Sequence, residues 1–271
     1  MRTIMAWRGR SETCNSEPLF YNPTVATTCA SVGLVLMAAA SLLGQNNPSP
    51  PGTPTSPEPT YVTCGQKPPL ATRTVRSDVF VSPDGKHRTY TEVEAKALYS
   101  QRPPGYSGPL CVNNSRLFAS EGTDFKIIFL QEPSDQETGN SLRPVDWSAD
   151  SRRLLLELAE WQYETPGTAR SILIYDARNG TFQQPDMMHL FRKQFGIECS
   201  LNIHVTGFTG EGKIGFETQP LVPEEEEVLA LPSCSRKKET YELDRSTETI
   251  IAVPGTLKIQ RNAKIEPASS K

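Results

Sequence analysis

The chain has 271 residues and a formal net charge of -3, with 28 Lys and Arg against 31 Asp and Glu. This length suffices for one large domain or two small ones, whose hydrophobic core needs no metal or cofactor to form. The near-neutral balance lacks the basic surface that neutralisation of nucleic-acid phosphates requires. Three histidines in the whole chain offer little material for a histidine-based metal or acid/base site. We therefore expect no nucleic-acid partner, no metal and no cofactor.

The first feature along the chain is an uncharged apolar stretch at residues 25–43, VATTCASVGLVLMAAASLL. A helix of about 20 apolar residues covers the hydrocarbon core of a bilayer. Three arginines precede the stretch and the first charged residue after it is Glu58, so the positive-inside rule predicts that the rest of the chain is exported. We expect residues 1–44 to be an apolar helix that is either a signal peptide, with residues 38–40 (Ala-Ala-Ala) as an A-x-A-like cleavage site, or an uncleaved membrane anchor.

A proline-rich run follows at residues 45–60 and contains no large apolar side chain. Such a run cannot pack a core and favours an extended linker. It is either a spacer that holds the domain away from a membrane or a leader that remains after cleavage. The domain is then expected at residues 61–271, in a periplasmic, secreted or outward-facing anchored protein that meets the membrane only through its N-terminal segment.

Four cysteines lie in the expected domain. An even number of cysteines in an exported domain indicates disulfides, and free buried thiols are the alternative. None of the four has the spacing of a zinc site. Proximity in the sequence favours pairing the first with the second and the third with the fourth; the residues are Cys64, Cys111, Cys199 and Cys234.

Three segments share one design, an apolar strand, a polar turn and a second strand. They are VFVSPDGKHRTYTEVEA at residues 79–95, VDWSADSRRLLLELAEW at 145–161 and VTGFTGEGKIGFETQP at 205–220. Proline presets one turn angle, aspartate accepts hydrogen bonds from the amides that follow it, and glycine tolerates a positive φ. The turn residues that carry this prediction are Ser82, Asp84, Gly85, Ser148, Asp150 and Gly212.

Each predicted hairpin is followed by a further strand-like stretch, FKIIFL at residues 125–130, SILIYD at 171–176 and ETYEL at 239–243. The second of these ends in Asn179-Gly180, which favours a tight turn between strands. TIIAV at residues 249–253 adds a last short strand. Their β-branched and aromatic residues suit half-buried strands, so we expect an all-β domain of four-stranded antiparallel sheets.

The segments SPDGKHRTY and WSADSRRLLL, with the later ILIYDARNG, resemble the repeat of TolB-type, WD-repeat-like β-propeller proteins. The resemblance implies blades near residues 78–140, 144–200 and 204–254 in a small or incomplete propeller. Closed rings generally have four or more blades. A degenerate fourth blade, an open ring and assembly with a partner all remain possible at this stage, and open sheet edges would favour oligomerisation.

No catalytic motif is found. Gly105-Tyr106-Ser107-Gly108 is not the nucleophile motif G-x-S-x-G, and His87, His189 and His204 are dispersed along the chain. The acidic run at residues 224–227 is typical of a solvated loop rather than a calcium site.

Long loops on a rigid scaffold commonly carry binding. The insertion at residues 96–115, with Tyr99 and Tyr106, and the insertion at 189–198 are therefore candidate recognition loops.

Three functions are compatible with these features. The first is an exported, non-enzymatic binding module for a protein or a cell-envelope component. The second is a hydrolase or lyase that uses carboxylates at the propeller centre, such as Asp84, Asp150 or Glu211. The third is a structural envelope protein without a dedicated ligand.

Overall fold

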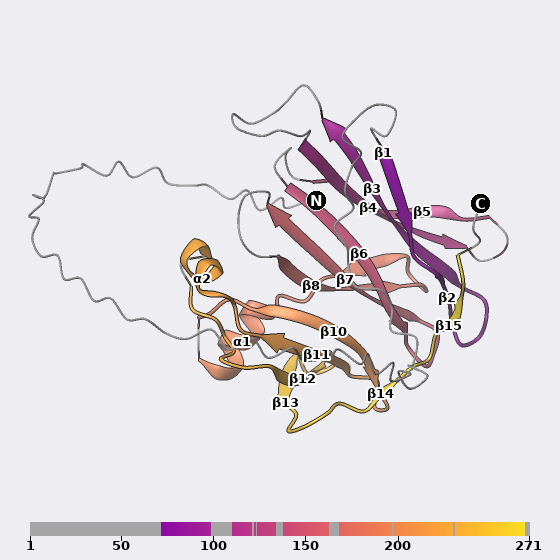
Figure 1. Cartoon of the computed structure of the whole chain (residues 1–271). Coiled ribbons are helices and arrows are strands. Elements are labelled where there is room, and N and C mark those ends of the chain that lie inside the picture. Colours follow the sequence, from indigo (N-terminus) through magenta and orange to yellow (C-terminus); the bar gives the residue numbers. More distant parts are fainter. Residues whose placement is uncertain are drawn as a thin grey trace, which may run out of the picture. The chain divides into compact units, whose positions relative to one another are not determined.

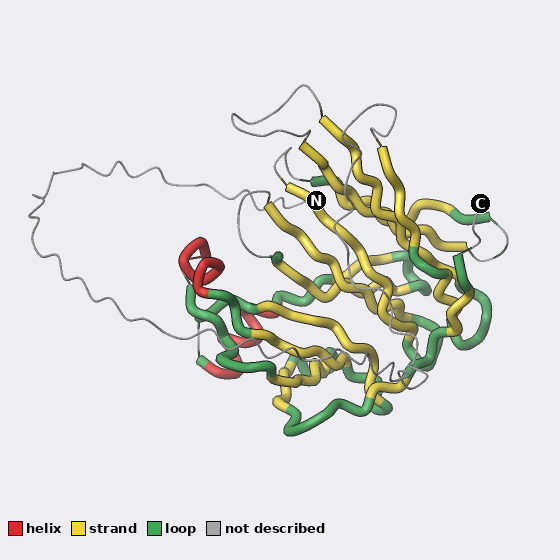
Figure 2. Tube along the Cα trace, in the orientation of Figure 1, coloured by secondary structure: helices red, strands yellow, loops and turns green. Residues whose placement is uncertain are grey.

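The structure is a computed structural model that describes residues 72–98, 110–120, 122, 124–133, 138–162, 168–196, 198–229 and 231–268. Within these ranges the chain forms fifteen strands and two helices. The strands belong to three antiparallel sheets (Figures 1 and 2). The predicted apolar helix, the proline-rich linker and Cys64 lie outside the described residues.

The first sheet has the strand order β15-β2-β3-β4-β5, and β1 pairs with the part of β3 beyond β2. Its strands β1 and β2 are separated by two residues only, so together they form the first strand of this sheet. The bounds are β1 Thr72–Arg76, β2 Val79–Val81, β3 Arg88–Leu98, β4 Leu110–Ser120, β5 Lys126–Gln131 and β15 Lys264–Glu266.

The second sheet has the order β6-β7-β8-β9 and the third has the order β13-β12-β11-β10-β14. In the second sheet the bounds are β6 Thr138–Trp147, β7 Arg153–Gln162, β8 Ala169–Asp176 and β9 Thr181–Gln183. In the third they are β10 Asn202–Thr209, β11 Ile214–Gln219, β12 Glu239–Asp244, β13 Thr249–Ala252 and β14 Ile259–Gln260.

Each predicted repeat therefore supplies consecutive strands that pair with their neighbours in chain order. This confirms the expected all-β class with antiparallel sheets, and each sheet contains four strands that are consecutive in the chain when β1 and β2 are counted as one. None of the sheets closes on itself within the described part of the chain. The C-terminal segment at residues 255–268 supplies two further strands, because β14 pairs with β10 in the third sheet and β15 pairs with β2 in the first.

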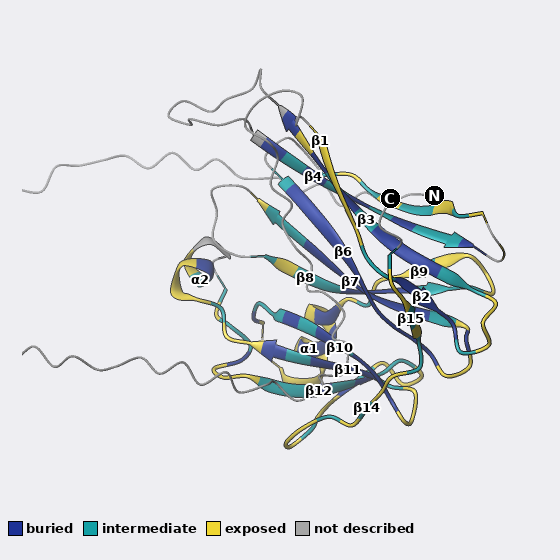
Figure 3. Ribbon diagram, turned by 45° about the vertical axis from the view of Figure 1, so that its right-hand side comes forward, coloured by how far each residue is buried: buried dark blue, intermediate teal, exposed yellow. Residues whose placement is uncertain are grey.

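The second sheet lies between the other two (Figure 1). One of its faces packs against the first sheet in a cluster that includes Phe80, Leu117 and Trp147. Its other face packs against the third sheet in a cluster that includes Leu155 and Val205. Successive side chains of a strand point to opposite faces, so the continuous apolar run of β7 reflects burial on both sides. Figure 3 shows the same burial along β6, whereas β1 is exposed.

Both helices lie beside the third sheet (Figure 2). Helix α1, Met187–Phe195, begins after Asp186, whose carboxylate accepts the backbone N–H of His189 at 2.9 Å, and ends at Gly196 with a φ of 69°. These caps satisfy amides and carbonyls that a helix end leaves unpaired. The apolar face of α1 packs on the sheet, with the ring of Phe191 5.2 Å from that of Tyr241.

The prediction of a loop at residues 96–115 is wrong at its two ends. Strand β3 continues to Leu98 and β4 begins at Leu110. From Cys111 to Leu117 every second residue of β4 is buried, and two of these inward residues, Asn113 and Ser115, are polar although fully buried. Their polarity hides the alternation by which a half-buried strand is recognised.

The acidic run at residues 224–227 is also not a loop but part of helix α2, Pro223–Leu229. Glu225 accepts the backbone N–H of Val222 at 2.8 Å, and Glu226 accepts that of Ser233 at 2.8 Å. Carboxylates near a helix N-terminus are favoured by the unpaired amides and the helix dipole. The acidic run therefore stabilises the first turn of this short helix.

Candidate functional site

The first repeat turn joins β2 to β3. Ser82 donates its hydroxyl to a carboxylate oxygen of Asp84 at 2.6 Å and accepts the backbone N–H of His87 at 3.0 Å. Asp84 also accepts the backbone N–H of Lys86 at 3.1 Å, and the serine and lysine contacts hold the pKa of this exposed carboxyl below its usual value. Gly85 has a φ of 75°. The carboxylate is thus occupied in shaping the turn.

The second turn, between β6 and β7, repeats these bonds. Ser148 donates to Asp150 at 2.6 Å and accepts the backbone N–H of Arg153 at 2.9 Å. Ser151 takes the place of the glycine and holds a φ of 61°. Its hydroxyl accepts the backbone N–H of Asp84 in the first turn at 3.0 Å. A serine in a backbone conformation that suits glycine is therefore explained by a hydrogen bond that joins two sheets.

The third turn, between β10 and β11, is one residue shorter. The backbone N–H of Thr209 donates to the carbonyl of Lys213 at 2.9 Å, and the carbonyl of Thr209 accepts the backbone N–H of Gly212 at 2.9 Å. Gly212 has a φ of 77°. Lys213 pairs with Glu211 at 2.7 Å and with Glu242 at 3.4 Å. The hydrogen bond to Glu211 is the largest cause that raises the pKa of Lys213.

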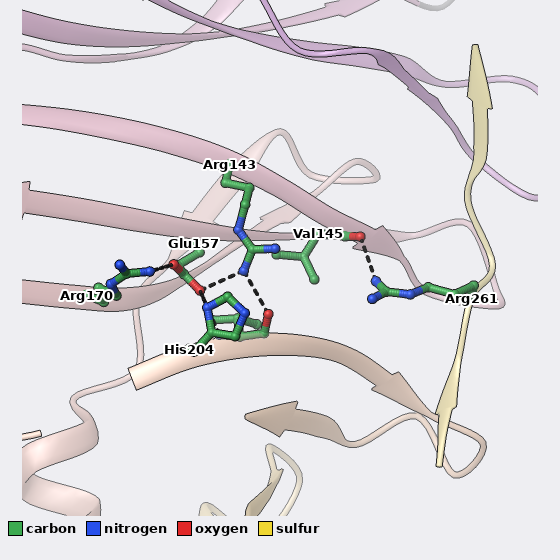
Figure 4. A network of polar contacts seen from close by, with 7 residues as sticks. Arg143, Val145, Glu157, Arg170, His204 and Arg261 are labelled. Carbon is green, nitrogen blue, oxygen red and sulfur yellow. Dashed lines mark hydrogen bonds and ion pairs between the residues drawn. The ribbon is translucent and has the colours of Figure 1, made fainter. Parts of the chain in front are cut away.

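A buried ion cluster lies between the second and third sheets (Figure 4). The fully buried carboxylate of Glu157 accepts hydrogen bonds from Arg143 at 2.8 Å and Arg170 at 2.9 Å, and from the backbone N–H of Val205 at 2.7 Å. The Nδ1 of His204 lies 3.3 Å from the same carboxylate. Burial alone would raise the pKa of Glu157, but the His204 contact, the Arg143 charge and the Val205 N–H outweigh it and lower the pKa to about 2.

The cluster covers the edge of a strand. Arg143 donates to the backbone carbonyl of Val205 at 2.9 Å, while Glu157 accepts the N–H of the same residue. The two side chains from the second sheet thus provide the donor and the acceptor that a neighbouring strand would offer to β10. Unpaired strand edges invite pairing with other chains, and this ion pair blocks one such edge.

The sequence analysis did not identify Glu157 or Arg143. The available signal was the one glutamate in the apolar run LLLELA, residues 154–159, at a position facing inward. Buried charges are normally paired, so this position indicates a buried partner without saying which. Because the Glu157 side chain has no exposed surface, we assign the cluster to the stability of the fold.

Among the described residues, a pocket of about 420 Å³ lies between the first and second sheets beside their repeat turns. It is lined by His87, Thr89, Ala119, Ser120, Gly122, Asp124, Lys126, Ile128, Trp147 and Tyr175. The ring of His87 is stacked on that of Trp147, with centroids 5.6 Å apart. A neighbouring pocket of about 350 Å³ shares His87 and Gly122. Together they form what we name the turn-end pocket.

A third pocket, about 260 Å³, lies between the end of β9, helix α1 and the turn after β12. His189 and Leu190 of α1 line it together with Arg245 and Glu248. The second candidate recognition loop, predicted at residues 189–198, is thus largely part of a helix at the rim of this pocket. Tyr99 and Tyr106 of the first candidate loop lie outside the described residues.

One predicted disulfide is confirmed. Cys199 and Cys234 are bonded, with Cα atoms 4.9 Å apart. The bond joins the segment before β10 to the segment after α2. Cys111 in β4 is also disulfide-bonded, and its expected partner Cys64 lies outside the described residues.

Across the described ranges no group of three or more His, Cys, Asp and Glu side chains is arranged to hold a metal ion. In the same ranges no helix is long and apolar enough to cross a membrane. The comparisons with known proteins are also negative: no protein-family model, no curated protein and no solved structure matches the chain.

Proposed function

We propose that this chain is an exported, non-enzymatic binding module, with TolB-like blades in an open propeller-like arrangement, for a protein or a cell-envelope partner. The turn-end pocket carries this proposal. Its volume lies within the range of about 300–1000 Å³ that is typical of ligand sites. It combines the half-buried rings of His87 and Tyr175 with the charged side chains of the exposed residues Lys126 and Asp124. Such a surface holds an apolar group and orients it through polar contacts.

The contacts of the three carboxylates that a hydrolase or lyase would use support a binding function instead. Asp84 and Asp150 each accept a serine hydroxyl and a backbone amide of their own turn, and Glu211 pairs with Lys213. In each group these contacts involve one carboxylate oxygen and tie the side chain to its own turn. We therefore assign the three carboxylates to the shape of the turns.

Export is supported by the disulfide-bonded cysteines, because disulfides persist in oxidising compartments. The uncharged stretch at residues 25–43 supports it independently, through its length and the arginines that precede it. In this proposal the domain faces the outside of the cell and the turn-end pocket meets the partner there.

Site-specific photo-crosslinking in the cells that produce the full-length chain tests this function. A photoreactive residue replaces Lys126 in the turn-end pocket, and a matched variant carries it at the exposed Lys237, on the loop before β12. We expect a discrete adduct from position 126 that position 237 does not form, and its loss when Tyr175→Ala is added. The absence of an adduct at position 126, or the same adducts at both positions, would refute the proposal.

A further inference from the structure

Two of the turns between strands have the same design. They are residues 176–180, between β8 and β9, and residues 244–248, between β12 and β13. In each turn the carboxylate of the first residue accepts the backbone N–H of the third at 2.9 Å. The last residue of each has a positive φ, 66° at Gly180 and 51° at Glu248. The third sheet therefore places a glutamate where the second sheet has the glycine that this backbone conformation favours.

The described part of the fold gives this glutamate no structural role. Within the described ranges Ser151 and Glu248 are the two residues other than glycine with a positive φ. Ser151 joins the first two sheets through the hydrogen bond of its hydroxyl. The carboxylate of Glu248, in contrast, forms neither a hydrogen bond nor an ion pair with any described residue. An unfavourable backbone conformation at a side chain without a structural role indicates a functional one.

Glu248 lines the third pocket, of about 260 Å³. Arg245, from the same turn, also lines it, and among the described contacts the two side chains form no ion pair with each other. The wall also includes the start of helix α1, with His189 and the capping residue Asp186. We name this site the helix-end pocket. It presents a cation and a carboxylate that do not neutralise each other.

The guanidinium of Arg245 lacks a full counter-charge. Arg245 is partly buried, and its hydrogen bond to a described residue goes to the amide oxygen of Gln183. Burial and the charge of Arg153 lower the pKa of Arg245, and the charge of Asp176 offsets them only in part. A guanidinium has five N–H donors in a planar fork that matches a carboxylate. Arg245 therefore has donors available for the carboxylate of a ligand.

The two carboxylates of the helix-end pocket differ in their availability. One oxygen of Asp186 accepts the backbone N–H of His189 at 2.9 Å and so caps the helix. Glu248 has no such contact and is exposed, so both of its oxygens can accept hydrogen bonds from a bound ammonium group. Three further lining residues are apolar: Pro185, Leu190 and Leu243. The pocket thus offers partners for a carboxylate, an ammonium group and an apolar side chain.

We propose that the helix-end pocket binds a free α-amino acid with an apolar side chain. Arg245 binds its carboxylate and Glu248 binds its ammonium group, while its side chain lies toward Leu190. An α-amino acid carries both charges on one carbon atom, so a single small ligand satisfies both groups. A ligand with one charge leaves either Arg245 or Glu248 without a partner. The pocket volume lies below the range of about 300–1000 Å³ that is typical of larger ligands, which also favours a small molecule.

Calorimetric titration of the full-length chain with three matched compounds tests this proposal. L-Leucine carries both charges, leucinamide lacks the carboxylate, and 4-methylpentanoate lacks the ammonium group. We expect saturable binding of L-leucine at one site. Each analogue should bind more weakly by about tenfold or more, because one charge-assisted contact is lost. The absence of saturable binding of L-leucine, or binding of an analogue as tightly as L-leucine, overturns the proposal.

Replacement of Glu248 by glycine separates binding from folding. Glycine is the residue of the equivalent turn, so we expect the urea midpoint of Glu248→Gly to rise while the affinity for L-leucine falls about tenfold or more. Glu248→Gln keeps the shape of the side chain without its charge and should weaken binding as well. Unchanged affinity in Glu248→Gly contradicts the ammonium contact. A lower urea midpoint would assign the glutamate to the fold and equally overturn the proposal.

The carboxylate contact is tested by Arg245→Gln. This variant should bind L-leucine about tenfold more weakly or less, and it should lose the preference for L-leucine over leucinamide, because that preference depends on the guanidinium. Arg116→Gln is the matched control, since Arg116 of β4 is a partly exposed arginine that pairs with Glu94 in the first sheet; its affinity for L-leucine should be unchanged. If the preference survives in Arg245→Gln, or if both variants weaken binding equally, the proposal fails.

Discussion

Replacement of Glu157 by glutamine tests the role of the buried ion cluster most directly. Gln has the shape of Glu but no charge, so Arg143, whose side chain is 6% exposed, loses its counter-ion in the interior. Breaking a buried pair in this way costs about 3–5 kcal/mol. For a domain of about 200 residues this corresponds to a melting temperature lower by about 10 °C, from about 2–4 °C per kcal/mol.

The pH dependence of stability gives a second estimate of the same contribution. In the folded chain the pKa of Glu157 is lowered from 4.5 to about 2. The ionised carboxylate therefore stabilises the fold above the unfolded pKa of 4.5, and this stabilisation is lost as the pH falls from there toward 2. Its size is about 3 kcal/mol, at about 1.4 kcal/mol per pKa unit. The glutamine variant should lose correspondingly less stability on acidification.

Urea unfolding followed by tryptophan fluorescence, at pH 7 and at steps down to pH 3, measures both effects, because Trp147 is buried between two sheets. Glu94→Gln is the matched control: Glu94 pairs with Arg116 at 3.1 Å with both side chains about a quarter exposed, and such pairs contribute about 0–1 kcal/mol. A Glu157→Gln variant that is no less stable than the control would refute the role assigned to the cluster.

A double variant separates the charge from the covering of the strand edge. Arg143→Met with Glu157→Leu removes both charges, a change that is often neutral or stabilising when only the ion pair matters. Here it also leaves the N–H and the carbonyl of Val205 unpaired, at a cost of about 1–3 kcal/mol for each group. We expect the double variant to remain less stable than the unaltered chain. Full recovery would show that the side chains do not serve as a surrogate strand.

Three further changes are measured in the same unfolding assay. Ser151→Ala should destabilise by about 1 kcal/mol through the lost bond between turns, and Ser151→Gly by less, because relief of the positive φ offsets that loss; equal effects would contradict this. Gly215→Ala should cost about 1–3 kcal/mol, because the added Cβ would lie 2.8 Å from the side chains of Leu257 and Ile259. Gly122→Ala, whose Cβ would meet open space, should be near neutral. Replacing both Cys199 and Cys234 by serine should cost about 4 kcal/mol, from the 35-residue separation; an unchanged midpoint would show that the bond contributes nothing.

Local chemistry made much of the architecture predictable. The serine and aspartate of the first turn form their bonds within six residues, as do those of the second turn, so their geometry can be read from the sequence without knowing what surrounds them. The pairing of Cys199 with Cys234 follows likewise from their proximity. Strand β4 escaped recognition because Asn113 and Ser115 are polar residues on its buried face.

By itself, then, the sequence determined the elements whose interactions are short in range: the repeat turns and the antiparallel hairpins that these turns close. Only the tertiary structure decided which faces meet. The Glu157 cluster joins residues up to 62 positions apart, and the bonds of Asp146 to the C-terminal segment span 116 and 117 positions. The physical reason is that the partner of a buried charge, or of a glycine against which another segment packs, is set by the packing of distant parts of the chain. The periodicity along one strand does not encode that packing.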